Sequence, residues 1–197
     1  MKAVIASNNP NKLREMKDIL SAAGWELMSQ REAGCHVEPE ENGATFEENS
    51  RIKAAAVMEV TGLPAIADDS GIEVDALDGA PGVHSARYGG DACPDDESRN
   101  DLLLANMASV PEENRTARFV SVITMVWPDG KTVSARGELE GAILHQRRGT
   151  GGFGYDPLFY IPGEGCTMAE LSPERKNRIS HRAKALQGFV NKLTEGI

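Results

Sequence analysis

Apolar residues recur along this chain in two spacings, one typical of strands and one typical of helices. Strands are predicted where short apolar runs are bounded by turn residues, at 2–6, 25–29, 65–67, 117–127 and 132–139. Helices are predicted where apolar residues recur about every 3.6 positions, at 12–23, 45–61, 95–107 and over much of 172–195. No internal repeat or long linker interrupts this order, so we expect one domain over residues 1–197.

Two adjacent carboxylates follow the short apolar run at 65–67. The run ends on Asp68 and Asp69, and Ser70 and Gly71 come next, before the chain alternates again. We expect the strand to end here, which would place both acids at the rim of a sheet, where α/β proteins bind their ligands. The alternative is a simple turn, because Asp, Ser and Gly are ordinary turn residues. Two acids on so apolar a run favour a functional site.

A polar loop at 7–11 separates the first predicted strand from the first predicted helix. Backbone N–H groups at the start of a helix are unpaired and the helix dipole is positive there, so this position favours a bound phosphate. Lys12 in the first turn opposes the dipole, which a nearby bound anion would explain. A plain surface lysine beside an asparagine-rich turn is an equally good interpretation of this segment taken alone.

Residues 30–44 are predicted to form an acidic loop that leads into the second predicted helix. Thr45 and the acid three residues later have the spacing of a capping box, so this helix is predicted to open at Thr45. Lys53 lies near the edge of the helix's buried face. Magnesium binds one or two carboxylates together with substrate phosphates. Glu40 or Glu41 could therefore join the two aspartates if the loop folds back over the strand ends.

A glycine-rich stretch at 149–154 contains the G-x-G-x-x-G spacing of dinucleotide-binding proteins. That motif requires a strand before it and a helix after it, whereas this one runs into Tyr155, Asp156 and a proline. The lysine that a P-loop requires is also missing, so we reject both nucleotide-loop interpretations. We expect instead a flexible backbone that presents Phe153, Tyr155 and Asp156 to a flat ring. A glycine-rich corner around a core phenylalanine is the alternative.

The last predicted helix carries an apolar stripe at positions 183, 186, 190 and 193. At about 100° per residue, His181 falls nearly opposite this stripe, so we expect that it is not a packed core histidine. Lys176 would fall on the buried side of a continuous helix, and burying an unpaired lysine is costly. Either the helix breaks near Ser180, or Lys176 faces a wet site. With Arg182, these residues are predicted to form a corner that binds an anion or a carbonyl group.

Composition excludes several classes of protein. The 197 residues are 40% hydrophobic and 26% charged, with a formal net charge of −9, so we expect neither nucleic acid nor an anionic membrane as a partner. No apolar run approaches membrane-spanning length, and the first residues lack the apolar region of a signal peptide. Cys35, Cys93 and Cys166 are odd in number and far apart, which favours reduced thiols and indicates a cytoplasmic protein.

Several segments together carry a family resemblance, in the order SNNPNK (7–12), the Glu40-Glu41 loop, Lys53, AIADDSG (65–71), GAPGVHSARY (79–88), GTGGFGYDPLF (149–159) and SHR (180–182). In this order and spacing they resemble the inosine/xanthosine triphosphate pyrophosphatase family, which hydrolyses non-canonical purine nucleoside triphosphates. The resemblance spans nearly the whole chain. Tyr155 stands where the family often has Trp, and residues 7–9 stand where it often has Thr-Gly-Asn.

The resemblance implies an α/β fold with a long mixed sheet flanked by helices, in two lobes with the active site in the cleft between them. It implies a homodimer that requires Mg²⁺ and converts a nucleoside triphosphate to the monophosphate and pyrophosphate. Asp69 would be the general base and a metal ligand, and Glu41 the other ligand. The substrate-binding residues would be Ser7, Asn8, Asn9, Pro10, Asn11, Lys12, Lys53, Ser70, Phe153, Gly154, Tyr155, Asp156, Lys176, His181 and Arg182.

The chemistry of such a reaction gives each group a task. Lysines and Mg²⁺ would neutralise the triphosphate, and Asp69 would take a proton from the attacking water. Asp68 and Asp69 should resist double ionisation unless a metal is present. Donors from His181, Arg182 and loop N–H groups would select a 6-oxo purine, because the 6-amino group of adenine would leave them unpaired.

Three other functions remain open at this point. One is a pyrophosphatase for modified pyrimidine triphosphates, which shares the chemistry but not the substrate. The others are a nucleotide-binding module without catalysis and a dinucleotide-dependent oxidoreductase. The acid set and the well-placed lysines favour an enzyme over an inert binder, and the missing strand–glycine–helix context argues against the oxidoreductase.

Overall fold

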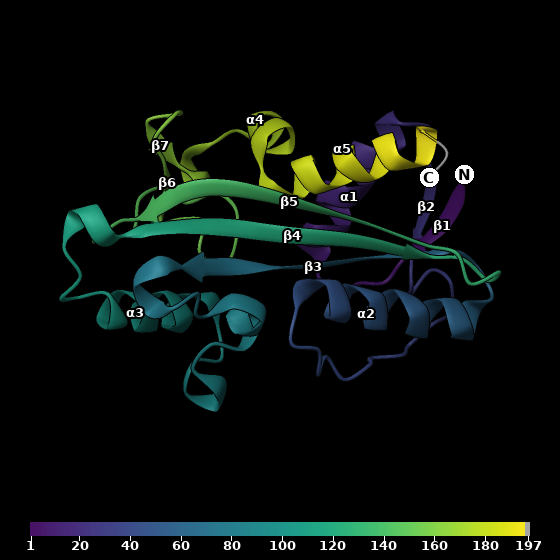
Figure 1. Ribbon diagram of the computed structural model, residues 1–197, viewed down its shortest axis with the longest axis horizontal. Coiled ribbons are helices and arrows are strands. Elements are labelled where there is room, and N and C mark those ends of the chain that lie inside the picture. Colours follow the sequence, from purple (N-terminus) through teal and green to yellow (C-terminus); the bar gives the residue numbers. More distant parts are fainter. Residues whose placement is uncertain (196–197) are drawn as a thin grey trace. The chain divides into compact units, whose positions relative to one another are not determined.

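The computed structural model describes residues 1–195, which belong to two compact units (Figure 1). Unit 1 contains residues 1–69, 121–137 and the C-terminal segment from His181, and unit 2 contains residues 70–120 and 138–180. The strands are β1 (Lys2–Ile5), β2 (Glu26–Ser29), β3 (Ala65–Val74), β4 (Thr116–Val126), β5 (Thr132–Ile143), β6 (Phe159–Ile161) and β7 (Cys166–Thr167). They form one mixed sheet in the order β2-β1-β3-β4-β5-β6-β7, which confirms the expected α/β fold.

The described residues also form five α-helices and several short 3₁₀ turns, and two of the helices follow the last strand. The helices are α1 (Pro10–Ala22), α2 (Phe46–Thr61), α3 (Asp96–Asn106), α4 (Pro173–Ile179) and α5 (His181–Thr194). The long connection after β3 contains three 3₁₀ turns, η1 (Asp75–Leu77), η2 (Gly82–Arg87) and η3 (Gly90–Ala92). Two more such turns, η4 (Glu112–Asn114) and η5 (Met168–Glu170), precede β4 and α4. None of the helices in this part of the chain is both long and apolar enough to span a bilayer.

In unit 1 the parallel strands β2, β1 and β3 are covered on both faces. β1 pairs in parallel with β2 and with β3, where Ile5 lies opposite Ile66. Ile5 and Ile66 pack into a cluster with residues of α1 and α5, among them Leu20 and Phe189. The alternate residues of β1 and β3 pack into a second cluster with α2, through residues such as Val57. Figure 1 shows α2 on the opposite side of these strands from α1 and α5.

Side-chain caps set the starts of helices α1 and α2. The side chain of Thr45 accepts a hydrogen bond from Glu48 N, and the Glu48 carboxylate accepts one from Thr45 N. Together they form the predicted capping box of α2. Helix α1 begins at Pro10, two residues before the predicted start, because Asn9 caps it. Its side-chain oxygen accepts hydrogen bonds from Asn11 N and Lys12 N. The prediction of unpaired amides at this helix start is therefore wrong.

Unit 2 has its own core, built on the second halves of β3 and β5 and the first half of β4. Fully buried residues of β3, α3, β4 and β6 meet there, including Ile72, Leu103, Ala117 and Phe159. Arg115 lies just before β4, is also buried, and donates hydrogen bonds to backbone carbonyls before and after it in sequence. Such a guanidinium fixes several chain segments at once, since each carbonyl would otherwise be buried without a donor.

The expectation that a strand ends at the two aspartates is wrong. β3 continues without a break from Ala65 through Asp68 and Asp69 to Val74. The turn-forming residues stay extended because Ile72 N donates to Ser85 Oγ, 2.9 Å away, and so has a partner. Gly71 fits only without a side chain, since a Cβ there would lie 2.4 Å from both Gly82 O and Ser85 Oγ. Packing from η2 thus overrides the local turn propensity.

Residues 172–195 form two helices, which confirms one of the two alternatives for this segment. Ser180, in an extended conformation, separates α4 from α5. Lys176 is buried in α4, and its ammonium group lies 2.8 Å from the Asp156 carboxylate. The break and the ion pair together explain how this lysine is buried. His181 at the start of α5 is also buried, so the expectation that it avoids the packed interior is wrong.

Candidate active site

The two aspartates of β3 face opposite sides of the sheet, although they are adjacent in sequence. Successive residues of a strand alternate between faces, so Asp68 continues the side of Ile66 and Asp69 the side of Ala67. Ile66 packs with α1 and α5, whereas Ala67 packs with α2. β1 pairs with β3 only as far as Ile66, so both carboxylates lie just beyond the last paired residue of this parallel neighbour.

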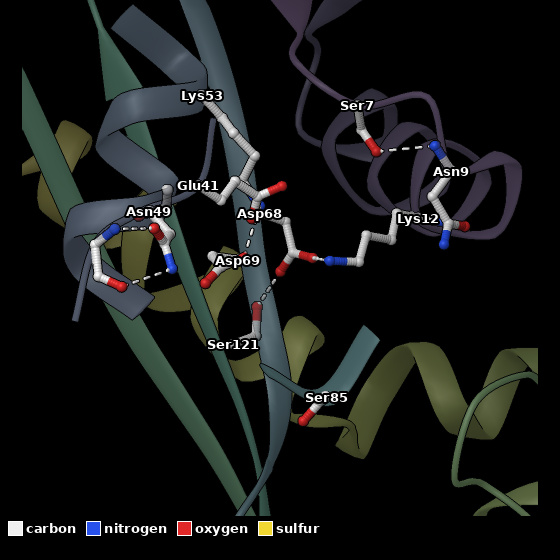
Figure 2. A network of polar contacts seen from close by, with 12 residues as sticks. Ser7, Asn9, Lys12, Glu41, Asn49, Lys53, Asp68, Asp69, Ser85 and Ser121 are labelled. Carbon is white, nitrogen blue, oxygen red and sulfur yellow. Dashed lines mark hydrogen bonds and ion pairs between the residues drawn. The ribbon is translucent and has the colours of Figure 1, made fainter. Parts of the chain in front are cut away.

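Asp68 is buried and fully engaged by groups from its own side of the sheet (Figure 2). Lys12 Nζ lies 2.8 Å and Arg182 Nη2 3.1 Å from Asp68 Oδ2, while Ser121 Oγ donates to Asp68 Oδ1. Burial alone would raise the pKa of Asp68, but the Arg182 and Lys12 charges hold it well below its usual range. Arg182 is in turn ion-paired with Glu15 of α1. Asp68 is therefore the counter-ion of one buried cation, Arg182, and of one partly exposed cation, Lys12.

This arrangement corrects the interpretation of Lys12. Its position in the first turn of α1 suggested a bound anion as a partner, and the partner is Asp68. Burial is the largest influence on the Lys12 ammonium and lowers its pKa, while the Asp68 charge opposes that effect. The Lys12 side chain is still partly exposed. It lies close enough to Lys53, another predicted phosphate ligand of unit 1, for the Lys53 charge to lower its pKa.

Asp69 lies on the α2 side in a less complete set of contacts. Lys53 Nζ lies 2.6 Å from Asp69 Oδ1 and 3.0 Å from Glu41 Oε2, so this ammonium group bridges the two carboxylates. Asp69 Oδ2 is buried and has no hydrogen-bond partner among the described residues. Burial raises the pKa of Asp69, with the Glu41 charge adding to the effect and Lys53 opposing it. A buried carboxylate oxygen without a donor is the kind of atom that binds a metal ion or takes a proton.

Glu41 is the member of the acidic loop that reaches this cluster. Its carboxylate is about two-thirds buried, whereas Glu40 is exposed. Burial is the largest single influence and alone would raise the pKa of Glu41, but the charge and the hydrogen bond of Lys53, with smaller contributions from neighbouring groups, together lower it. We expected the charge of Asp68 to oppose ionisation of Asp69. The neighbouring carboxylate that raises the pKa of Asp69 is instead that of Glu41.

The loop before α1 is held by its own polar groups. Ser7 Oγ accepts a hydrogen bond from Asn9 N at 3.2 Å (Figure 2). Asn8 Nδ2 donates to Glu38 Oε1 at 2.9 Å. Asn11 Oδ1 accepts from Arg14. The predicted phosphate loop therefore lies beside the acidic loop in unit 1, and the lysine next to it is the one that bonds Asp68.

In unit 2 the predicted base-binding residues form a rigid loop, contrary to the flexible backbone that the glycines suggested. Asn100 Nδ2 donates to Gly154 O at 2.8 Å, and Gly154 N donates to Asp96 Oδ2 at 2.6 Å, so α3 holds both sides of this glycine. Gly152 has a φ of +73°, and a Cβ there would lie 1.9 Å from Asp156 Oδ2. The glycines permit close backbone contacts and do not leave the loop loose.

Phe153 is partly exposed in that loop, whereas Tyr155 is buried. Lys176 Nζ lies 4.5 Å from the centre of the Phe153 ring, and its partner Asp156 accepts a hydrogen bond from Phe153 N at 3.0 Å. Tyr155 is buried, and its hydroxyl donates to Ser85 O at 2.8 Å. The expectation that the Tyr155 ring is presented for stacking is wrong, because it packs in the core of unit 2. Ser70 lies half-buried in β3.

Sequence reasoning missed several residues that hold these groups. Glu15 next to the stripe of α1 and Ser121 within the apolar strand β4 both bind the Asp68 cluster. The signal was present, since each is a polar residue in a segment whose neighbours are buried. The cysteines behave as predicted, because Cys35, Cys93 and Cys166 are all free. Within residues 1–195 no three His, Cys, Asp or Glu side chains gather as a ready-made metal cluster.

The fold and the site define an α/β protein whose interior strand β3 carries two adjacent buried carboxylates, each paired with a lysine. The chain belongs to the Ham1 family, whose model matches residues 3–192. It is 50% identical over 196 residues to a dITP/XTP pyrophosphatase of Thermus thermophilus, covering 100% of this chain and 93% of that protein. It is 52% identical over 183 residues to the Geobacter sulfurreducens dITP/XTP pyrophosphatase, covering 93% and 92%. A solved HAM1 protein from Coxiella burnetii has 40% identity and a TM-score of 0.89 over the full length of both chains.

Proposed function

We propose that this chain hydrolyses non-canonical purine nucleoside triphosphates, ITP, dITP and XTP, to the nucleoside monophosphate and pyrophosphate. Full-length similarity to proteins named dITP/XTP pyrophosphatase supports the substrate class. The structural observation that carries the proposal is Asp69 Oδ2, a buried carboxylate oxygen without a hydrogen-bond donor among the described residues, beside Lys53 and Glu41. Such a group is suited to activating water next to a charged substrate.

The donor set also supports a divalent cation of the Mg²⁺ type as the cofactor. Asp69 and Glu41 offer carboxylate oxygens, the hard ligands that Mg²⁺ prefers, and one of these oxygens has no other partner. Two protein carboxylates together with substrate phosphates are the usual Mg²⁺ arrangement in phosphate chemistry. When bound, Mg²⁺ would neutralise phosphate charge and polarise the bond to be broken.

The chain's own residues would perform the remaining tasks. Lys12 and Lys53 of unit 1 would bind phosphate oxygens, which lowers the repulsion that a triphosphate exerts on an incoming water. Asp69 would accept a proton from that water. Its raised pKa suits this task, because a base works best when its pKa approaches the working pH. Ser7, Asn8, Asn9, Pro10 and Asn11 are proposed to line the phosphate loop.

Two sets of residues are proposed to contribute to base selection. In unit 2, Phe153 would stack on the purine while Lys176 and the Gly154 to Asp156 backbone contribute polar contacts. In unit 1, His181 and Arg182 would supply donors. A site built from donors accepts the 6-oxo group of hypoxanthine or xanthine and rejects the 6-amino group of adenine. The homodimer stays a prediction of the family resemblance, and the cytoplasmic location stays a prediction from the cysteine pattern.

One assay tests the proposal. Pyrophosphate release would be measured from ITP, dITP, XTP, GTP, ATP and a modified pyrimidine triphosphate, with Mg²⁺ and with EDTA. We expect the highest kcat/KM for the inosine and xanthosine substrates and no turnover in EDTA. Turnover of ATP as fast as ITP, or preference for the pyrimidine, would reject the substrate class. Release of orthophosphate would reject the assigned bond.

A further inference from the structure

The backbone of Gly43, in the acidic loop that carries Glu41, is hydrogen-bonded to helix α2. Gly43 N donates to Asn49 Oδ1 at 2.8 Å, and Asn49 Nδ2 donates to Gly43 O at 3.4 Å (Figure 2). The side-chain amide of Asn49 therefore pairs with both polar groups of a single residue. Gly43 is only two residues after Glu41, so this contact limits where the Glu41 carboxylate can lie.

The contact is tight on both sides. Asn49 is fully buried within α2, where an asparagine has no helix propensity to recommend it. Gly43 has no space for a side chain, because a Cβ would lie 2.7 Å from Asn49 Oδ1 and from Glu48 Cβ. The next residue of the loop is also bound, since Ala44 N donates to Glu48 Oε2 at 2.6 Å. A buried amide in such surroundings specifies one position for the loop.

Two of the contacts between helix α2 and the acidic loop bear directly on Glu41. Asn49 binds the backbone at Gly43, and Lys53, one helical turn further along, binds the Glu41 carboxylate and also Asp69. The Lys53 contact alone is an ion pair that water and a cation can exchange, because the Glu41 side chain is 32% exposed. The Asn49 side chain is fully buried and neutral, so we expect its contact with Gly43 to persist when charges in the site change.

We propose that Asn49 is a positioning residue that holds Glu41 next to Asp69 and thereby sets the affinity of the site for a divalent cation. The inference rests on the proposed function in one respect, that Glu41 and Asp69 bind the cation together. The two ligands come from separate elements, a loop and a strand, and a cation gains from both only if their distance is fixed beforehand. Groups that orient metal ligands are commonly worth 10- to 100-fold in affinity.

Cation binding to the protein without nucleotide tests the proposal directly. Mn²⁺ serves as the probe, because its electron paramagnetic resonance signal reports free ion. Asn49→Leu keeps the size of the side chain and removes both hydrogen bonds, and we expect it to raise the Mn²⁺ Kd by about 10- to 100-fold. Gly43→Ala displaces the same contact from the other side and should raise the Kd similarly. The double variant should bind no more weakly than the weaker single variant, because both remove one interaction.

Ser50→Ala is the matched control. Ser50 is also fully buried in α2, and its hydroxyl lies 2.7 Å from Thr124 Oγ1 of β4, which is not part of the acidic loop. We expect this variant to lower the melting temperature while leaving the Mn²⁺ Kd unchanged. Melting curves for all variants separate lost stability from lost positioning.

The kinetic readout distinguishes positioning from catalysis. Asn49→Leu should need more Mg²⁺ for half-maximal activity, and its kcat at saturating Mg²⁺ should approach that of the wild type. A wild-type Mn²⁺ Kd in Asn49→Leu, or Mn²⁺ affinity lost equally in Ser50→Ala, would overturn the proposal, as would a wild type that binds no Mn²⁺. Failure to hydrolyse inosine or xanthosine substrates would reject the proposed function and leave the Mn²⁺ comparison to decide the role of Asn49.

Discussion

Asp68 and Asp69 show how strongly one step along a strand changes the surroundings of a side chain. Asp68 has Lys12, Arg182 and Ser121 as partners, and its pKa lies well below the usual range because two cations outweigh its burial. Asp69 has one oxygen on Lys53 and one without a donor, and burial raises its pKa. The first carboxylate is fixed in its charged form, and the second is suited to exchange a proton or bind a cation.

Substituting each aspartate with asparagine should therefore damage different properties. Asp69→Asn should lower kcat by about 10²- to 10⁴-fold, the usual worth of a general base, with a melting temperature near that of the wild type. Asp68→Asn should cost about 3–5 kcal/mol of stability, because it leaves the buried Arg182 and the partly exposed Lys12 without this counter-charge. Activity assays paired with urea unfolding check both. Near-normal kcat in Asp69→Asn would remove the general-base role, and a stable Asp68→Asn would remove the counter-ion role.

Glu32 gives a pH prediction away from the site. Its carboxylate accepts hydrogen bonds from Ser29 N at 2.6 Å and Ser29 Oγ at 2.9 Å and pairs with Lys17, which lowers its pKa to about 2. A folded-state pKa below the unfolded value stabilises the fold above the unfolded pKa. That contribution is lost as the pH falls toward the folded value. The wild type should thus be more stable than Glu32→Gln at neutral pH and lose that advantage between about pH 5 and pH 2.

Urea unfolding at several pH values measures this difference. The control is Glu26→Gln, whose carboxylate has one exposed lysine 3.7 Å away and should show little change at any pH. A Glu32→Gln deficit that stays constant down to the lowest pH would contradict the assigned hydrogen bonds.

At the residue scale, the sequence predicts which charged side chains lie together better than it predicts which side chains are buried. The grouping of Asp69, Lys53 and Glu41 agrees with the prediction, because acids and lysines on a largely apolar framework must find one another. His181 and Tyr155 were misjudged because their burial depends on segments distant in sequence. The hydroxyl of Tyr155, for example, bonds Ser85, and nothing local indicates that contact.

At the scale of elements, the contact between β5 and α5 depends on a glycine. A Cβ at Gly137 would lie 2.3 Å from Ala185 N and from His181 O, so the helix backbone packs directly on the strand. We expect Gly137→Ala to cost about 1–3 kcal/mol. It should also lower kcat/KM, because it displaces the helical turn that begins with His181. Thermal unfolding and steady-state kinetics check the two effects.

Gly188 provides the matched control in the same interface. It lies inside α5, and a Cβ there would be 3.7 Å from Ala135 Cβ, an ordinary contact. Gly188→Ala should therefore stabilise the protein by about 0.5–1 kcal/mol through helix propensity. If both alanine variants behaved alike, the close approach at Gly137 would not be what positions α5.

Most elements were predictable because their apolar spacing is regular. α1, α2, α3 and β4 lie within two residues of the predicted limits, and the hairpin partner β5 extends four residues further, to Ile143. The failure at β3 has a physical cause. Asp, Ser and Gly favour turns locally, yet Ser85 and Gly82 from η2 stabilise an extended chain there. Local propensity gives way wherever a distant segment supplies the partner.

At the scale of the whole molecule, the first and last helices of the chain depend on each other. α1 and α5 pack in one cluster, where Phe189 is fully buried and its ring centre lies 5.9 Å from that of Trp25. Unit 1 is therefore completed only when the C-terminal segment is present. We expect Phe189→Ala to cost about 3–5 kcal/mol, and the neighbouring, partly buried Val190→Ala to cost about 1 kcal/mol. Urea unfolding followed by tryptophan fluorescence compares them, and equal costs would contradict this dependence.

The division into units was not predictable from the sequence. The chain passes between the units after Asp69, Val120, Gly137 and Ser180. At three of these points it stays within one continuous strand, so no composition change or linker marks the boundary. The net charge of −9 predicted that any cations that bind an anionic ligand would be gathered locally. Lys12 and Lys53 do lie together, beside the two aspartates of β3.

The opposite faces of Asp68 and Asp69 also bear on how the gene can change. A one-residue deletion between Ile66 and Asp68 would turn each carboxylate toward the other face of the sheet. The cations of α1 and α5 would then meet the second aspartate, and Lys53 would meet Ser70. Substitutions at neighbouring positions can be absorbed one at a time, but a change in length here inverts the site in a single step. This part of β3 must therefore keep its length.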